Sequence, residues 1–165
     1  MVIRELKYSD IKEYKRYIEE WKFYNEKIVP QASDIKMKNF NDFIKFLNNE
    51  KSNSRWVNNT TLFYFEKNEI LGSINVRFHL NENLLKVGGH IGYGVKKSRR
   101  GNGIAEKLLK KGMETLKLSG YHYALITCSS ENIASQKVIS KFKNKKISNS
   151  IDNEGNIQYR YILYL

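Results

Sequence analysis

The sequence predicts an α/β (α+β) fold, in which a mixed sheet of about seven strands carries packed helices. Two observations support this prediction. Apolar residues recur at helical spacing in four segments, and strand-like segments bounded by turn residues make up much of the rest. The predicted order is β-α-α-β-β-β-α-β-α-β-β. A chain of 165 residues has the size of one domain, so we expect a single domain over residues 1–165.

The first third of the chain is predicted to form a strand, two helices and a loop between them. Residues 2–7, "VIRELK", are typical of a short strand, and Asp10 with Glu13 resembles a capping box. Residues 27–34 contain the only proline, Pro30, and are expected to form a loop. Helical spacing on both sides of this loop is seen in Ile11, Tyr14, Ile18, Trp21 and Tyr24, then in Phe40, Phe43, Ile44 and Leu47.

Residues 60–95 are predicted to form three strands. Residues 60–80 resemble a hairpin with its turn at 67–68, and residues 84–95 a third, glycine-rich strand. Glycine weakens a strand, so these glycines indicate a bulge or a close approach of a ligand to the backbone. Alternation gives the third strand two faces: Ile91, Tyr93 and Val95 on one, His90, Gly92 and Gly94 on the other.

The last third is predicted to form two further helices and three strands. A helix that begins after Gly103 and stops at Gly120 is followed by a strand at 121–128 and a helix at 130–143. The tail is expected to form two strands around a turn at 153–155. The apolar face of the first of these helices comprises Ala105, Leu108, Leu109, Gly112, Met113 and Leu116.

The chain is strongly basic: 29 Lys and Arg residues against 17 Asp and Glu residues give a formal net charge of +12. Two interpretations stay open. The charge attracts a polyanion, either nucleic acid or a phosphorylated cofactor, or it reflects only the base composition of the source genome. The lysines are spread over the whole chain without a basic tail, so charge alone does not choose a partner.

Several ordinary signals are missing from the sequence. No apolar run approaches the ~20 residues of a membrane span, and "MVIRELKYSD" at the start does not resemble a signal peptide. Cys128 is the only cysteine, so no internal disulfide can form. We therefore expect a cytoplasmic protein with no membrane partner and no metal site.

Residues 98–109, "SRRGNGIAEKLL", place two arginines and two glycines directly before a helix. The glycines uncover main-chain N–H groups, the helix dipole adds partial positive charge, and the guanidinium groups add bidentate donors. This pattern favours a diphosphate, although glycines also begin ordinary tight turns; it fits neither the dinucleotide fingerprint nor the P-loop. The expected anion site comprises Arg99, Arg100, Gly101, Asn102, Gly103, Ile104 and Ala105.

Two segments together resemble the GNAT superfamily, the GCN5-related N-acetyltransferases. "RGNGIA" (100–105) fits the signature Arg/Gln-x-x-Gly-x-Gly/Ala and follows a strand that ends in "GYGV". "NIASQKVISKF" (132–142) resembles the second conserved segment of the family. Together with "GGHIGYGV" and "LITC", these segments look like a bacterial subgroup of predicted acetyltransferases. The resemblance implies the GNAT fold, with helices on both faces of the central sheet.

The resemblance also implies acetyl-CoA (coenzyme A) as cofactor. The diphosphate would lie over residues 100–105, and the pantetheine arm would pair with the backbone of the preceding strand. Gly92 and Gly94 would leave that backbone open to an amide-bearing ligand. The residues expected along the arm and near the thiol are Tyr93, Gly94, Val95, Asn132 and Ser135.

In GNAT enzymes an amine attacks the thioester directly within a ternary complex. His90 is the candidate base, because its ordinary pKa suits proton removal at neutral pH; a packed structural histidine is the alternative. Many members place a tyrosine at the position occupied here by Ile139, so the usual acid is missing and Tyr93 is one candidate to replace it. Trp21 and Tyr24 are expected on the acceptor wall, or else in the core.

Three functions from different classes follow from these observations. The first is an N-acetyltransferase that transfers an acetyl group to a primary amine of a small molecule or peptide. The second is a catalytically degenerate GNAT domain that binds acyl-CoA as a sensor or regulator, since the usual acid is missing. The third is a nucleic-acid or ribosome-associated module that uses the positive charge. The sequence contains no recognisable RNA-binding signature, so we do not expect nucleic acid as a partner. The oligomeric state is left open between monomer and homodimer.

Overall fold

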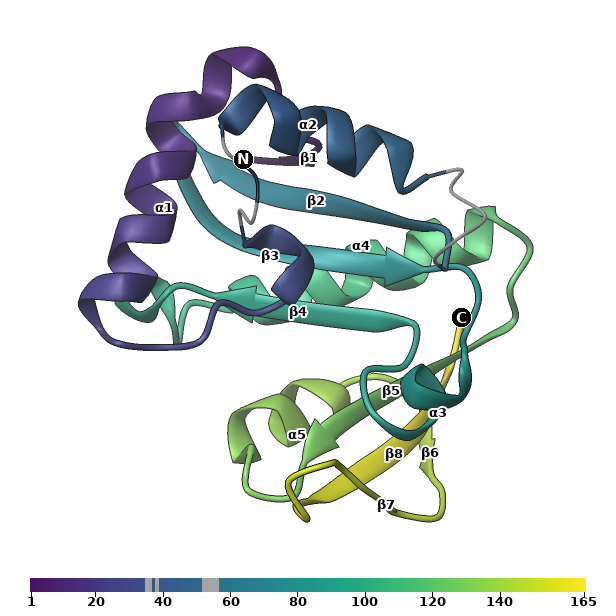
Figure 1. Ribbon diagram of the computed structural model, residues 1–165. Coiled ribbons are helices and arrows are strands. Elements are labelled where there is room, and N and C mark those ends of the chain that lie inside the picture. Colours follow the sequence, from purple (N-terminus) through teal and green to yellow (C-terminus); the bar gives the residue numbers. More distant parts are fainter. Residues whose placement is uncertain (35–36, 38, 52–56) are drawn as a thin grey trace.

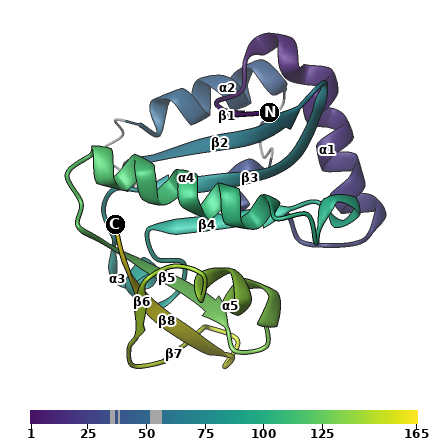
Figure 2. The same cartoon turned by 180° about the vertical axis from the view of Figure 1, so that it is seen from behind.

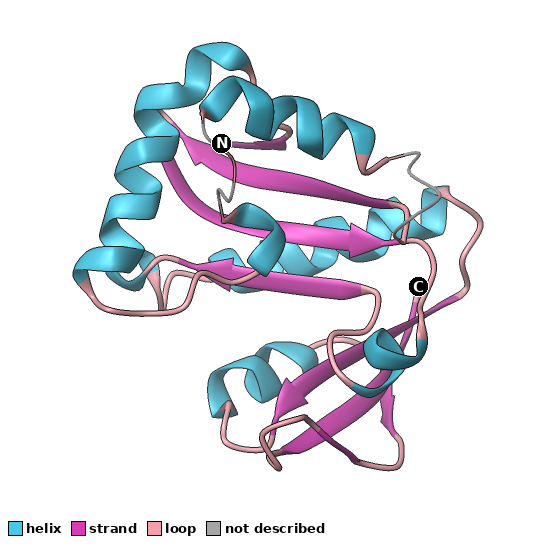
Figure 3. Ribbon diagram, viewed as in Figure 1, coloured by secondary structure: helices cyan, strands magenta, loops and turns pink. Residues whose placement is uncertain are grey.

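The computed structural model describes residues 1–34, 37, 39–51 and 57–165, and it confirms the α/β class. Two groups of strands are seen in Figures 1 and 3. The first is a four-stranded antiparallel sheet in the order β1-β2-β3-β4. Its strands are β1 (Val2–Arg4), β2 (Asn59–Glu66), β3 (Glu69–Arg77) and β4 (Ile91–Val95).

The second sheet lies in the C-terminal part of the chain. Its order is β5-β8-β6, with β7 also paired to β8, and every pairing is antiparallel. The tail therefore holds three strands where the sequence predicted two. The strands are β5 (Tyr123–Ser129), β6 (Asn144–Lys146), β7 (Ser150–Ile151) and β8 (Ile157–Tyr164).

Helices cover both faces of the first sheet, as the resemblance implied. α1 (Ile11–Phe23) and α2 (Phe40–Asn49) lie on one face, and α4 (Ile104–Leu118) crosses the other, as Figures 1 and 2 show. Two buried clusters correspond to these faces, because successive strand residues point to opposite sides. Phe63 packs with α1 and α2, whereas Tyr64 packs with α4. None of the described helices combines the length and apolar character that a membrane span requires.

Two short helices complete the α-helices and strands of the described residues, and one corrects the sequence prediction. α5 (Ile133–Ile139) follows β5, and α3 (Glu82–Lys86) occupies the first part of the segment predicted as a strand at 84–95. The side chain of Asn81 caps α3 by accepting the Leu84 N–H at 2.9 Å. This cap begins a helix where two leucines alone do not distinguish helix from strand.

The start of the chain also differs from the prediction. β1 ends at Arg4, and the Asp10 side chain makes no capping bond to α1. The Asp10 carboxylate instead accepts from the Arg4 guanidinium and, at 2.6 Å, from the Lys7 N–H. The expected capping box with Glu13 is therefore wrong, because an ion pair to β1 takes up the carboxylate.

Candidate functional site

The two sheets meet where β4 and β5 diverge. In the described part of the chain, one isolated bridge between Gly89 and Ile126 pairs these strands. At the two ends of β4, the main-chain carbonyl of His90 accepts from β3 and the main-chain N–H of Lys96 donates to β3. The even-numbered residues of β4 therefore direct their backbone hydrogen bonds to β3. The odd-numbered residues Ile91, Tyr93 and Val95 therefore direct their backbone groups to the outer edge. That edge can pair with the amides of an extended ligand.

The loop after β4 brings main-chain N–H groups to the start of α4. A short 3₁₀ turn, Lys97–Arg99, leads into Gly101 (φ 79°) and Gly103 (φ 71°), both left-handed. No atom lies within 4 Å of the place where a Cβ would stand at either glycine. Both the uncovered backbone and the helix dipole therefore fit a diphosphate, the group expected from the sequence.

The two arginines of this loop are held by carboxylates of the protein. Arg99 pairs with Glu69, and Arg100 pairs with Glu26 while its Nε donates to the Val95 carbonyl at 3.0 Å. The Asn102 side chain closes the turn by donating to the carbonyls of Arg99 (3.3 Å) and Arg100 (3.2 Å). The structure thus gives these arginines partners within the fold, and their contact with a diphosphate stays a prediction.

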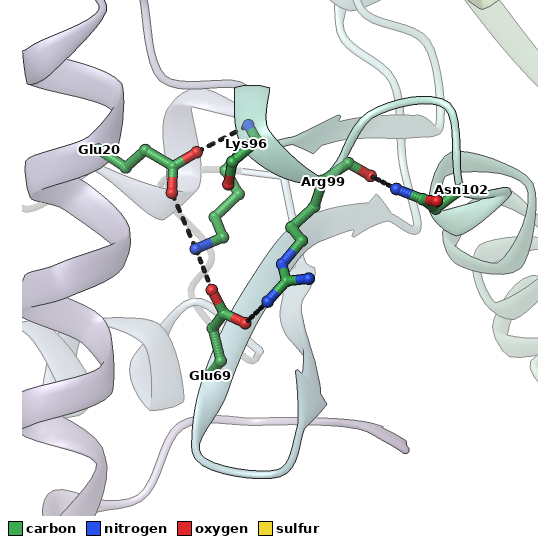
Figure 4. Close-up of polar contacts among 6 residues, drawn as sticks. Glu20, Glu69, Lys96, Arg99 and Asn102 are labelled. Carbon is green, nitrogen blue, oxygen red and sulfur yellow. Dashed lines mark hydrogen bonds and ion pairs between the residues drawn. The ribbon is translucent and has the colours of Figure 1, made fainter.

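A buried lysine ties this loop to α1 and β3, as Figure 4 shows. The Nζ of Lys96 lies 2.9 Å from Glu20 and 2.6 Å from Glu69, and the Ser98 N–H donates to Glu20 at 2.9 Å. Burial is the largest single effect and raises the pKa of each carboxyl, but the hydrogen bonds from Lys96 and from Ser98 or Arg99, together with the positive charges, outweigh it, and both pKa values fall below their ordinary value. Sequence reasoning missed this cluster, because nothing in "KK" at 96–97 separates a buried lysine from an exposed one.

Tyr93 joins β4 to the start of α5. Its hydroxyl and that of Ser135 are 2.9 Å apart, and Asn132 caps α5 by accepting the Ser135 N–H at 3.0 Å. Burial raises the pKa of Tyr93 to about 12, so the phenol is neutral at physiological pH. The structure thus brings together the three predicted residues from distant parts of the sequence. Ile139, at the position of the usual acid, is buried in the core.

His90 lies just before β4 and bonds to β5. The imidazole Nδ1 of His90 accepts the Leu125 N–H at 2.9 Å, and the main-chain N–H of His90 donates to the Leu125 carbonyl at 2.7 Å. Burial lowers the pKa of the imidazole below its ordinary value. A neutral ring that accepts at Nδ1 carries its hydrogen on Nε2, so the ring must give up the Leu125 bond to act as a base. The His90 ring packs edge-on against the ring of Tyr121. Tyr93, the candidate acid, instead contacts Ser135 of α5.

The two predicted acceptor residues lie beside the cations of the loop. Trp21 is 4% exposed and belongs to the core with α2, and the Arg100 guanidinium lies 5.6 Å from its ring centroid. Tyr24 is exposed, with the Lys97 Nζ 4.5 Å from its ring centroid. Their place on an acceptor wall stays a prediction.

Residues 28–33 lie along one face of β4, and sequence reasoning missed this contact. A Cβ at Gly94 would stand 2.0 Å from the Val29 carbonyl oxygen, and one at Gly92 would stand 3.5 Å from Pro30. The loop is fixed by the Ser33 hydroxyl, which donates to the Ser73 hydroxyl at 2.8 Å. The glycines of β4 therefore admit the protein's own loop on this face, whereas the sequence indicated a bulge or an approaching ligand.

These features define a class of protein: a split between two strands, a bare strand edge and a helix start with uncovered N–H groups. Comparison with known proteins agrees with it. The family model described as acetyltransferase (GNAT) domain matches residues 1–143, so the chain belongs to the GNAT acetyltransferases. Membership in this family agrees with acetyl-CoA as the cofactor expected from the sequence. No curated protein matches the chain.

Solved structures share the fold at low sequence identity. A GNAT-family acetyltransferase from Streptococcus pneumoniae is 17% identical, with a TM-score of 0.69 over 99% of this chain and 98% of that chain. A ribosomal-protein-alanine N-acetyltransferase from Brucella melitensis is 15% identical, with a TM-score of 0.67 over 100% of both chains. The putative acetyltransferase yncA from Salmonella typhimurium, solved with its cofactor acetyl-CoA, is 13% identical, with a TM-score of 0.65 over 99% and 93%.

Proposed function

We propose that the protein is an acetyl-CoA-dependent N-acetyltransferase that acts on a primary amine of a small molecule or peptide. One observation carries the proposal: the bare edge of β4 runs directly into the uncovered N–H groups of residues 101–105. A ligand with a diphosphate at one end and amides along its arm matches both parts at once. The ribosomal acetyltransferase of the same fold acts, by its name, on a protein amine.

The residues of the loop and of β4 would hold the cofactor in this proposal. The N–H groups around Gly101 and Gly103 bind the diphosphate, and the outer carbonyl of Tyr93 and the N–H of Val95, whose own carbonyl accepts from Arg100, pair with the pantetheine amides. Lys96 positions the loop through its two carboxylate partners. When bound, acetyl-CoA supplies the acetyl group as an activated thioester.

Three chemical tasks fall to the chain's own residues. The acceptor ammonium must lose a proton, and His90 is the candidate that takes it once Nδ1 is released from Leu125. The outward N–H of Tyr93 can stabilise negative charge on the thioester oxygen. The neutral Tyr93 hydroxyl, beside Ser135, can donate a proton to the departing thiolate.

A pair of matched glycine variants tests the cofactor site. Gly103 and Gly120 stand at opposite ends of α4, both left-handed (φ 71° and 86°) and both with open space at the Cβ position. Gly103→Val and Gly120→Val therefore carry similar backbone strain, but only the first places a side chain over the loop. We expect Gly103→Val to weaken CoA binding at least ~100-fold by calorimetry, as a blocked anion site would. Equal affinity in the two variants would contradict the site.

Release of the free thiol from acetyl-CoA separates the enzyme from the sensor. A panel of amines and peptides with free N-termini is mixed with the protein, and thiol is measured over time. Acetylation of an amine, seen by mass spectrometry, supports the enzyme. CoA binding without release of thiol for any amine would favour the acyl-CoA sensor, which the buried Ile139 at the usual acid position would explain.

A further inference from the structure

Arg77, at the end of β3, has donors that no described group of the protein uses. Its Nη1 donates to the carbonyls of Gly88 (3.0 Å) and Gly89 (2.9 Å), which uses both hydrogens of that nitrogen. Its Nε and Nη2 have no partner among the described residues and are not completely buried. One edge of the guanidinium is thus occupied, and the other edge has no partner.

The charge of Arg77 is also uncompensated. The guanidinium forms no ion pair with any carboxylate of the described residues, whereas all four cations of residues 96–100 do. Burial lowers its pKa to about 10, so the side chain still carries its charge at neutral pH. A half-buried cation without a counter-ion is costly, and a ligand anion would offset that cost.

The edge without partners lies against β4, close to the bridge from which β4 and β5 diverge. The Nη2 lies 3.2 Å from the position of a Cβ on Gly92, on the face of β4 that the loop at Pro30 also covers. The Gly88 N–H donates to Thr127 of β5 at 2.7 Å, so Arg77 supports the turn that joins the two sheets. Arg77 stands at the opposite end of β4 from the glycine loop of residues 96–103, beyond the residues 93–95 that were assigned to the pantetheine arm.

We propose that the Nε–Nη2 edge of Arg77 binds a carboxylate of the acceptor, and that the acceptor is an amino-acid-like amine. This inference rests on the proposed function, because it takes the amine to enter at the divergence of β4 and β5. A guanidinium edge with two parallel N–H groups matches a carboxylate in a bidentate geometry. A polyamine, which has no anion, would be repelled by the same group.

The test compares L-amino acids with their carboxamides, which differ only in the anionic group. Each of the twenty protein amino acids and its amide is titrated into CoA-loaded protein by calorimetry, and each is assayed for thiol release with acetyl-CoA. We expect at least one amino acid to bind ~10- to 100-fold more tightly than its amide, the value of a charge-assisted bidentate contact. Equal binding of acid and amide, or binding of neither, would overturn the inference without any variant.

Variants locate the contact at Arg77. Arg77→Lys keeps the charge but loses the two parallel N–H groups, and Arg77→Gln loses both. Each variant should remove most of the preference for the amino acid over its carboxamide, and should raise the KM of the amino acid more than it changes kcat. Arg16→Gln, at an exposed arginine of α1, is the control that keeps the preference. A preference that persists in folded Arg77→Gln, as judged by circular dichroism, would contradict the assignment.

The two proposals fail in different ways. If no amine releases thiol but the carboxylate still binds in an Arg77-dependent manner, the acyl transfer is wrong and the anion site stands. If amines without a carboxylate are acetylated as well as amino acids are, transfer stands and the role of Arg77 is wrong.

Discussion

The loop of residues 96–103 and the turn that holds Arg77 lie at opposite ends of β4, and their cations have different partners. At the loop, Lys96, Arg99 and Arg100 all meet carboxylates of α1, the following loop or β3. At the turn, Arg77 meets only backbone carbonyls. A cation already paired within the protein fixes geometry, whereas an unpaired one is available to a ligand. From this difference we expect backbone N–H groups to bind the ligand at the end of β4 next to α4, and the Arg77 side chain to bind it at the other end.

Loss of Lys96 should give the largest effect on stability. Lys96→Met removes a buried charge and leaves the Glu20 and Glu69 carboxylates facing each other, so we expect a loss of about 2–3 kcal/mol in the free energy of unfolding. The neighbouring Lys97→Met is the control: its side chain is 50% exposed and 4.0 Å from Glu26, so the loss should stay below ~0.5 kcal/mol. Urea denaturation measures both. Equal losses would remove the distinction between a positioning cation and a surface one.

Gly94→Ala should give the next largest effect, because it pushes the loop of residues 28–33 away from β4. The added Cβ would stand 2.0 Å from the Val29 carbonyl oxygen, and we expect a loss of about 2 kcal/mol. Gly155→Ala, in an open turn at φ 86°, tests backbone strain alone and should cost about 1 kcal/mol. If thermal denaturation ranks Gly155→Ala as the more damaging, the loop does not pack on β4 as described.

His90 should give the smallest effect, one that depends on pH. Burial lowers its pKa in the folded protein below the 6.5 of an exposed imidazole. At a pH between these two pKa values, the unfolded chain binds more protons at His90 than the folded protein does. The contribution of His90 to the free energy of unfolding is therefore complete above pH 6.5 and is lost as the pH falls below 6.5. His90→Asn keeps an acceptor for the Leu125 N–H but cannot titrate, so its stability should vary less between pH 7 and pH 5. Parallel curves for variant and wild type would contradict a titrating His90.

The same variant tests His90 as the base. If the imidazole removes the proton, the rate of the wild type should fall only as the pH drops through the lowered pKa of the folded imidazole, and His90→Asn should lose both rate and that dependence. An unchanged rate profile would leave His90 as a structural link between β4 and β5.

Local patterns could be predicted from the sequence, and tertiary contacts could not. Helical spacing correctly placed Phe43 and Leu108 in the core, and the glycines at 101 and 103 indicated an uncovered helix start. The pairing of Lys96 depends on carboxylates 27 and 76 positions away, so no local signal indicates it. The short helix α3 escaped notice because its cap, Asn81, precedes a pair of leucines that suits a strand equally well.

The glycines of β4 show the same limit in another form. A glycine in a strand indicates that something approaches closely, but the sequence does not say what. At Gly94 the approaching group is the Val29 carbonyl of the protein itself. Likewise, two arginines beside a glycine loop suggest phosphate contacts, and only the structure reveals that both also pair with carboxylates of the protein.

The bare outer edge of β4 has a consequence for handling the protein. A strand with unsatisfied main-chain groups is a template onto which another molecule's strand can add, and such edges promote self-association. Here the Arg100 side chain covers one carbonyl of that edge, and the exposed, positively charged Lys97 follows it. A ligand with its own amides would shield the remainder, so the cofactor would act as a solubilising partner during purification.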